Sequence, residues 1–266
     1  MITGAILFAC YGAAALYMTL AQRSFVYHTA PAWLEPKDYG LPQAEATSQT
    51  MEDGITLRGW RIPPTQNDAP VYLYFHGNAD GLNERATRFA YLASTGAGVL
   101  AFSYRGYGGS GGTPTEALLH SDAREIYSAL SKIYPEKRII LFGESLGTGV
   151  ALELATHVNP AGIILDSPYY SVVERAHASY PWLPVSLLLQ DQFRSDLFIR
   201  HVGTPILILH GMRDELIPLS DSERLAALAK PGQVTRKLYN GQPHVVPLNK
   251  GPMPDILGFV AKVIAL

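Results

Sequence analysis

Short apolar runs alternate with amphipathic stretches along most of the chain. The apolar runs are rich in leucine and β-branched residues and have the length of buried strands, whereas the longer stretches between them have helical periodicity. Strands are predicted at residues 71–75, 98–104, 138–142, 163–166, 205–210 and 234–238. Helices are predicted at residues 84–94, 114–134, 146–157, 220–229 and 254–264. This alternation is typical of an α/β fold, with a largely parallel sheet covered by helices on both faces.

Two segments depart from the alternation. Residues 45–50 and 54–61 flank Asp53-Gly54, a pair that favours a tight turn, so we expect an antiparallel hairpin at one edge of the sheet. Residues 167–202 are too many for a simple turn between strands and are rich in leucine and aromatic residues. We expect this insertion to form short helices that cap the carboxyl edge of the sheet within a domain of residues 44–266.

The N-terminal segment, residues 1–22, has no charged side chain, and the first charge is Arg23. At about 1.5 Å per residue a helix of this length reaches about 30 Å, enough to cross a bilayer core. We interpret it as a single-pass membrane anchor followed by a proline-spaced connector, residues 23–43. A cleaved signal peptide and a helix packed on the domain surface are the alternatives. Arg23 after the segment favours a cytoplasmic catalytic domain.

Composition indicates one folded domain with a sizeable core. The 266 residues are 47% apolar and 17% charged, which excludes a disordered chain. The formal net charge is −2, and no basic stripe or lysine-rich run is present, which argues against a nucleic-acid partner. The sequence has no His-Glu-x-x-His motif and no Cys/His cluster, so we expect neither a metal nor a cofactor.

The motif Gly143-Glu144-Ser145-Leu146-Gly147 lies between a predicted strand and a predicted helix. A serine in such a tight turn needs small neighbours, because its backbone is strained and the two elements crowd together. Gly143 and Gly147 meet this need. The turn presents the hydroxyl group at the carboxyl edge of the sheet, so Ser145 is the predicted nucleophile.

A serine hydroxyl needs a base, and the base needs an orienting carboxylate. Asp214 follows the strand at 205–210, and His244, the one histidine after it, follows the strand at 234–238. Both are expected in loops at the carboxyl edge, so Asp214 is the predicted acid and His244 the predicted base. Asp166 and Glu215 are the competing acids.

The transition state of acyl transfer carries a negative oxygen that needs two N–H donors. The backbone N–H of Leu146, which follows the nucleophile, is one expected donor. The loop after residues 71–75 reads His76-Gly77-Asn78-Ala79, and the backbone of Asn78 is the expected second donor. His76 and Gly77 are then expected to support this loop.

With these motifs the sequence resembles the α/β-hydrolase superfamily. The resemblance covers about residues 45–266. Within the superfamily, the sequence is similar to the small membrane-anchored branch that includes lysophospholipases and protein depalmitoylases. It is also similar to bacterial serine aminopeptidase-like and monoglyceride-lipase-like hydrolases. The resemblance implies an eight-stranded sheet and a Ser-Asp-His triad at Ser145, Asp214 and His244. One departure is the loop Pro243-His244-Val245, where relatives usually have a glycine before the histidine.

We therefore expect a serine hydrolase that cleaves esters or thioesters of acyl or lipid-like substrates through an acyl-enzyme, with the aromatic and leucine-rich cap lining an acyl pocket. A peptidase acting on short peptides is the first alternative. It needs an acidic group that recognises a free amine, for which Asp191 and Glu174 are the candidates. A catalytically silent binding protein with the same fold is the second alternative.

Overall fold

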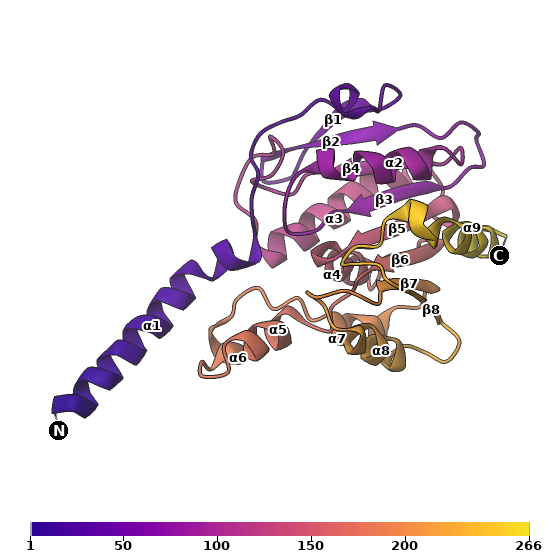
Figure 1. Cartoon of the computed structure of the whole chain (residues 1–266). Coiled ribbons are helices and arrows are strands. Elements are labelled where there is room, and N and C mark those ends of the chain that lie inside the picture. The colour runs from indigo at the N-terminus through magenta and orange to yellow at the C-terminus, as the bar shows by residue number, and fades with distance from the viewer. Residues whose placement is uncertain (1, 266) are drawn as a thin grey trace.

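The computed structural model describes residues 2–265, in which eight strands form one sheet (Figure 1). Its order is β1-β2-β4-β3-β5-β6-β7-β8. Strands β3 to β8 run parallel to one another, whereas β2 is antiparallel to both of its neighbours, β1 and β4. The antiparallel pair of β1 and β2 is the expected hairpin. The strands are β1 (Glu45–Thr50), β2 (Thr56–Ile62), β3 (Val71–Phe75), β4 (Gly98–Phe102), β5 (Ile139–Glu144), β6 (Gly162–Asp166), β7 (Ile206–Gly211) and β8 (Val234–Tyr239). The predicted mostly parallel eight-stranded sheet is confirmed.

Helices cover both faces of this sheet. Side chains of α2 and α9 pack in one buried cluster, and side chains of α3, α4 and α8 pack in the other. The insertion between β6 and β7 contains α5, α6 and α7. The helices are α1 (Ile2–Val26), α2 (Ala86–Ala93), α3 (Glu116–Ser131), α4 (Leu146–Leu154), α5 (Val172–Ser179), α6 (Val185–Leu188), α7 (Ser195–Phe198), α8 (Leu219–Leu228) and α9 (Pro252–Ile264).

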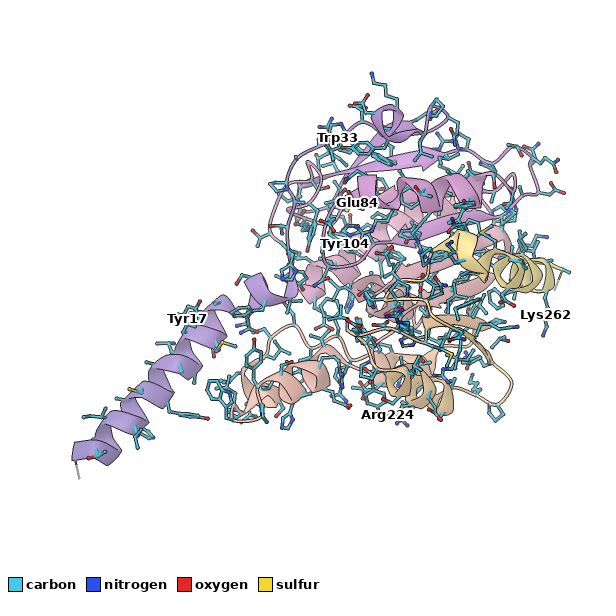
Figure 2. All side chains as sticks on the ribbon, in the orientation of Figure 1. Tyr17, Trp33, Glu84, Tyr104, Arg224 and Lys262 are labelled. Atoms are coloured by element: carbon cyan, nitrogen blue, oxygen red, sulfur yellow. The ribbon has the colours of Figure 1, made fainter. Side chains whose placement is uncertain are left out.

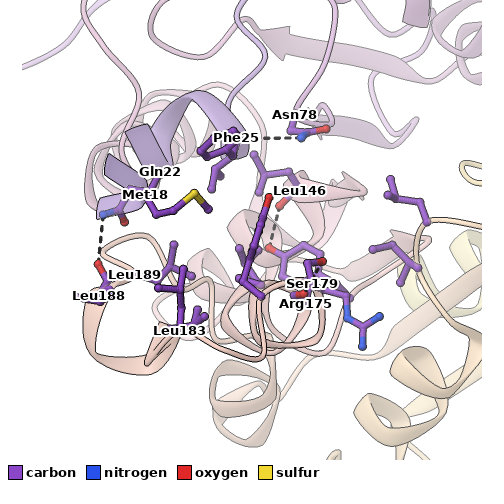
Figure 3. Close-up of a pocket in the computed structure, with 18 of the residues that line it drawn as sticks. Met18, Gln22, Phe25, Asn78, Leu146, Arg175, Ser179, Leu183, Leu188 and Leu189 are labelled. Carbon is purple, nitrogen blue, oxygen red and sulfur yellow. Dashed lines mark hydrogen bonds between the residues drawn. The ribbon is translucent and has the colours of Figure 1, made fainter. Parts of the chain in front are cut away.

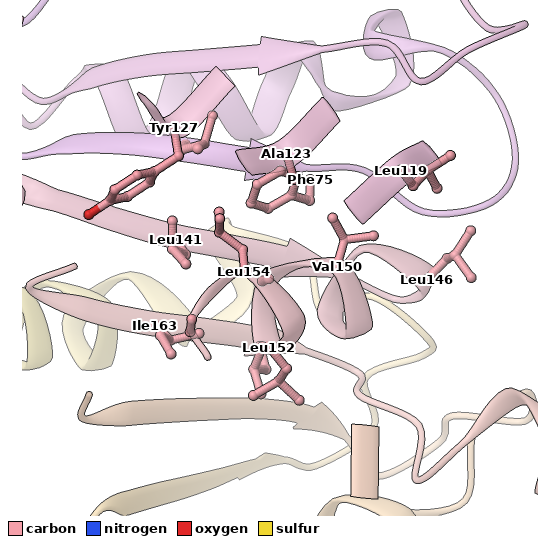
Figure 4. Close-up of a cluster of buried hydrophobic side chains, with 14 of the residues drawn as sticks. Phe75, Leu119, Ala123, Tyr127, Leu141, Leu146, Val150, Leu152, Leu154 and Ile163 are labelled. Atoms are coloured by element: carbon pink, nitrogen blue, oxygen red, sulfur yellow. The ribbon is translucent and has the colours of Figure 1, made fainter. Parts of the chain in front are cut away.

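The central strands are buried on both faces, which explains their continuous apolar runs. Along β5 successive side chains alternate between the two clusters, because strand side chains point to opposite faces. Leu141 packs with Val150 of α4, the helix that follows Ser145, while Phe142 packs on the other face (Figure 4). This packing fixes the end of β5, from which the candidate site is built.

Helix α1 projects away from the domain over much of its length (Figure 1). Tyr17 lies on the projecting part and is 64% exposed (Figure 2), and Phe8 is 80% exposed. By length and composition, residues Thr3–Val26 are able to cross a membrane. The other end of α1 is packed against the cap, because Gln22 is buried and Tyr27, just beyond the helix, is also buried.

Candidate active site

Ser145 lies in the tight turn between β5 and α4, with a φ of 50° and a ψ of −115°. This left-handed backbone is strained for a residue with a side chain. The turn is so close-packed that a Cβ atom on Gly143 would lie 2.6 Å from the carbonyl oxygen of Gly147. A Cβ atom on Gly147 would lie 2.1 Å from the carbonyl oxygen of Phe75. Both glycines therefore allow the close approach of the strand and the helix around Ser145 that the motif predicted.

The structure brings Ser145, His244 and Asp214 into one hydrogen-bonded series. His244 Nε2 lies 2.9 Å from Ser145 Oγ, although the two residues are 99 positions apart. His244 Nδ1 lies 2.8 Å from Asp214 Oδ2. In this arrangement the carboxylate accepts the Nδ1 proton, which leaves the lone pair of Nε2 facing the hydroxyl group of Ser145.

Asp214 is held as an anion by several donors. Its Oδ1 accepts hydrogen bonds from the N–H groups of Leu216 (3.0 Å) and Ile217 (2.8 Å). Burial alone raises the pKa of Asp214, but hydrogen bonds from His210, His244 and Ile217 outweigh it and hold that pKa well below its usual range. The carboxylate is thus charged and ready to stabilise a positive imidazole.

The competing acids Asp166 and Glu215 lie elsewhere. Asp166 Oδ1 accepts the N–H of Val246 at 3.2 Å, and its Oδ2 pairs with Arg88 Nη2 at 2.6 Å. Arg88 also donates to the carbonyl oxygen of Val246 at 2.9 Å. Asp166 and Arg88 therefore hold the loop that carries His244, while Glu215 is exposed to solvent.

In the loop that carries His244, the backbone is strained at the residue after the histidine. Val245 has a φ of 57°, which is costly for a β-branched side chain. Its N–H donates to Ser167 Oγ at 3.1 Å, and this bond helps to hold the unusual backbone. A strained, hydrogen-bonded valine thus follows His244 in this loop.

The two expected oxyanion donors, Asn78 and Leu146, border the same pocket as Ser145. The carbonyl oxygen of Asn78 accepts hydrogen bonds from the N–H of His28 (3.0 Å) and the hydroxyl of Tyr107 (2.7 Å). Within residues 2–265, the backbone N–H groups of Asn78 and Leu146 have no hydrogen-bond acceptor. Both N–H groups are therefore free to bind an oxygen atom of a substrate.

The loop of residues 76–79, the expected oxyanion loop, is supported from the core by Glu144. Its carboxylate accepts a hydrogen bond from the hydroxyl of Tyr74, and its Oε1 accepts one from the N–H of Gly77 at 3.3 Å. Arg85 pairs with Glu144 at 2.6 Å and also donates to the carbonyl oxygen of Ala79 at 2.9 Å. Burial raises the pKa of Glu144, but Arg85 and Arg88 overcome this and lower it to about 2. Sequence reasoning did not identify this network.

His76 lies beneath the same loop and is fully buried. Its Nε2 accepts the N–H of Tyr104 at 3.1 Å, so its proton resides on Nδ1, which lies 2.7 Å from the carbonyl oxygen of Gly77. Burial lowers the pKa of His76 to about 3, which keeps the ring neutral. His76 thus links the segment that follows β4 to the loop of residues 76–79.

Ser145 opens into an apolar pocket of about 340 Å³. Its walls come from the last turns of α1, from α5 and from the segment around α6 (Figure 3). Among the described residues, no aspartate or glutamate lines it. Residues 2–265 also contain no group of three or more His, Cys, Asp or Glu side chains placed to hold a metal ion.

Residues 66–198 match the family described as serine aminopeptidase, S33. The uncharacterised Mycobacterium tuberculosis protein Rv2307c is 38% identical over 218 residues, which cover 80% of this chain and 77% of that protein. Lysophosphatidylserine lipase ABHD12 of Danio rerio is 30% identical over 232 residues, which cover 73% of this chain and 61% of that protein. The Pyrococcus furiosus esterase Pf2001 has a similar fold, with a TM-score of 0.69 at 22% identity over 89% of this chain and 96% of that structure.

Proposed function

Because the chain belongs to the α/β-hydrolase superfamily, through the serine aminopeptidase S33 family, we propose that it cleaves carboxylic ester or thioester bonds of acyl substrates at Ser145. One observation carries this proposal: the hydrogen-bonded series of Ser145, His244 and Asp214 opens into an apolar pocket. The pocket is large enough for an acyl chain and is built mainly from leucine, valine and aromatic side chains.

The geometry supports an acyl-enzyme route. Ser145 Oγ attacks the carbonyl carbon while His244 Nε2 takes its proton, and the negative oxygen is bound by the N–H groups of Asn78 and Leu146. His244 then gives the proton to the leaving alcohol or thiol, and the C–O or C–S bond breaks. Water, deprotonated by His244, attacks the acyl-Ser145 ester, and the acid leaves as the serine regains its proton. Asp214 stabilises the positive imidazole at each stage.

The peptidase alternative lacks the acidic group that it needs. Asp191 is buried and pairs with Arg23 at 3.2 Å, and Glu174 pairs with Arg224. Neither carboxylate lines the pocket. A free amine would therefore find no partner there, and an apolar acyl group is the better fit. The similarity to a lysophosphatidylserine lipase favours the same substrate class.

We also propose that α1 anchors the chain in a membrane. The helix is uncharged from its start to Gln22, and large apolar side chains such as Phe8 and Leu20 are exposed on it. An exposed apolar surface of this length is costly in water and is favourable in lipid. The tight packing of Gln22 and Tyr27 on the domain favours a retained anchor over a cleaved signal peptide.

The test uses the full chain in detergent micelles, labelled with a fluorescent fluorophosphonate and then assayed with p-nitrophenyl esters of rising chain length. We expect labelling of the wild type and of Ser128→Ala, an exposed serine on α3, and none of Ser145→Ala. Ester hydrolysis should be lost in the same variant. Folded wild-type protein that neither labels nor hydrolyses any ester would instead support the binding-protein alternative.

A further inference from the structure

Helix α1 presents one face to the pocket and the opposite face to the outside. Met18, Gln22 and Phe25 lie three or four residues apart, as expected for one face of a helix, and all three line the pocket (Figure 3). Leu20 is 77% exposed and does not line it. A helix that served purely as a tether would need no such division near its domain end.

This part of α1 is fixed to the cap rather than loosely attached. Gln22 is buried, and its side-chain amide bonds the cap backbone twice: Nε2 donates to the carbonyl oxygen of Leu188 at 3.2 Å, and Oε1 accepts the N–H of Gln190 at 2.7 Å. One residue further, Arg23 pairs with the buried carboxylate of Asp191 at 3.2 Å. A buried amide satisfied in this way holds two backbones at a defined spacing.

The end of α1 is also bonded to the oxyanion loop. Asn78 Nδ2 donates to the carbonyl oxygen of Val26 at 3.1 Å, and the N–H of His28 donates to the carbonyl oxygen of Asn78 at 3.0 Å. The side chain of Asn78 therefore bonds the last residue of α1, and its carbonyl group bonds the segment that follows the helix. The position of the helix relative to Ser145 is defined at the same residue that offers a free N–H group to substrate.

The opposite wall is made by the cap between α5 and α7. Leu183, Leu188 and Leu189 line it, and residues 180–190 contain no Asp, Glu, Lys or Arg. The first charged residue after this segment is Asp191 and the first charge on α1 is Arg23, and these two residues pair with each other. Among the described residues that line the pocket, Arg175 of α5 is the charged side chain. Two uncharged segments thus lie on either side of the pocket, and Figure 3 shows Met18 opposite Leu183 and Leu189 across it.

We propose that α1 is part of the substrate site: its last two turns bind the acyl chain against the cap, and Met18 sets the chain length that fits. This inference rests on the proposed function, because it assigns the pocket to the acyl group of that substrate. The ligand class is a single-chain acyl ester or thioester, whose chain lies between α1 and the segment around α6. A larger side chain at position 18 shortens the space available to the acyl chain of the substrate, whereas the space for the reacting carbonyl group at Ser145 stays free.

The experiment compares Met18→Trp with Leu20→Trp, a matched change on the exposed face of the same helix, in the full chain in micelles. For Met18→Trp we expect kcat/KM for p-nitrophenyl acetate within about twofold of wild type and a roughly tenfold or greater loss for the dodecanoate ester. Leu20→Trp should match wild type at every length. Met18→Ala should move the preferred length towards longer chains.

The proposal is overturned if Met18→Trp leaves the dependence of kcat/KM on acyl-chain length unchanged. It is also overturned if Met18→Trp lowers kcat/KM equally for the acetate and dodecanoate esters. Binding of a fluorescent dodecanoic acid gives a second readout that needs no catalysis. We expect Met18→Trp to weaken this binding at least fivefold and Leu20→Trp to leave it unchanged. If the wild type hydrolyses no ester but shows this difference in binding, the proposed function fails and the acyl site on α1 stands. Equal binding by the two variants overturns the site.

Discussion

His210 Nε2 lies 3.2 Å from Asp214 Oδ2, the same carboxylate oxygen that faces His244 Nδ1 at 2.8 Å. His210 is fully buried at the end of β7, and its Nδ1 lies 2.8 Å from Ser222 Oγ. Its Nε2 faces two acceptors, Asp214 and the carbonyl oxygen of Ile217, so it carries the proton. His210 is therefore a positioning residue for the candidate acid.

Replacing His210 by Phe keeps a ring of similar size but removes the donor to Asp214. We expect kcat/KM for a p-nitrophenyl ester to fall about tenfold, while Asp214→Asn lowers it about 10³- to 10⁴-fold. The hydrogen bond from His210 lowers the pKa of Asp214. Without this bond the carboxylate that orients His244 is held less firmly, and this is the source of the expected loss of activity. His201→Phe, a change at an exposed histidine, is the control, and a His210→Phe variant with the kcat/KM of wild type contradicts the assignment.

The strained backbone of Ser145 predicts opposite effects of two substitutions on stability. Glycine adopts a φ of 50° readily, so Ser145→Gly should raise the free energy of unfolding by about 1 kcal/mol. Ser145→Ala keeps a Cβ atom and therefore keeps the strain, so its stability should stay close to wild type. Urea unfolding of the three proteins measures the difference, and equal stability of the two variants would show that the turn stores no strain.

The fold and the three candidate catalytic residues were predictable because their signals are local. Apolar runs identify the central strands, and a serine between Gly143 and Gly147 needs the tight turn in which the structure places it. Asp214 and His244 follow strands whose carboxyl ends meet at one edge, so their proximity follows from the topology. Their catalytic roles stay predictions.

The supporting contacts were not predictable, because they join segments far apart in the chain. Arg85 and Glu144 are 59 positions apart, and Gln22 meets Leu188 across 166 positions. Neither pair belongs to a spacing pattern, and an arginine on a short helix has the same sequence signature whether it is exposed or buried. The strain at Val245 was not predictable either, because valine rarely adopts a left-handed backbone and its presence therefore does not indicate one.

Glu144 predicts a pH dependence of stability. Its pKa falls from an ordinary value of 4.5 to about 2 in the folded protein, so its ionised form stabilises the fold. This contribution is complete above about pH 4.5 and is lost as pH falls from 4.5 towards 2. Glu144→Gln should lower the free energy of unfolding at pH 7 by about 3 kcal/mol, because Arg85 then lacks its buried partner.

The measurement is urea unfolding of both proteins between pH 7 and pH 3. The stability of wild type should fall more steeply with acid than that of Glu144→Gln, so the gap between the two proteins narrows. Glu125→Gln, a change outside the site on α3, is the control for loss of a carboxylate. Parallel curves for wild type and Glu144→Gln would mean that the carboxylate of Glu144 does not stabilise the fold through its charge.

Helix α1 contacts the cap as early as Tyr11, and this contact predicts where Trp182 lies in a membrane. The hydroxyl of Tyr11 donates to the carbonyl oxygen of Trp182 at 3.2 Å, and the two rings pack edge to face. Tyr11 precedes Arg23, the first charge of α1, by 12 residues, which is about 18 Å along a helix. An α1 that crosses a bilayer therefore carries Trp182 into the hydrocarbon, where its 51% exposed ring meets lipid.

Fluorescence in vesicles of brominated phosphatidylcholine tests this, because bromine quenches tryptophan at close range. The chain has three tryptophans, and Trp60 is buried in the core, while Trp33 packs against Arg58 of the domain. We expect strong quenching in wild type and in Trp33→Phe, and a loss of most of it in Trp182→Phe. Bromines deep in the acyl chain should quench more than bromines near the headgroup. Equal quenching of wild type and Trp182→Phe would place the cap outside the lipid and would require α1 to leave the cap on entering the membrane.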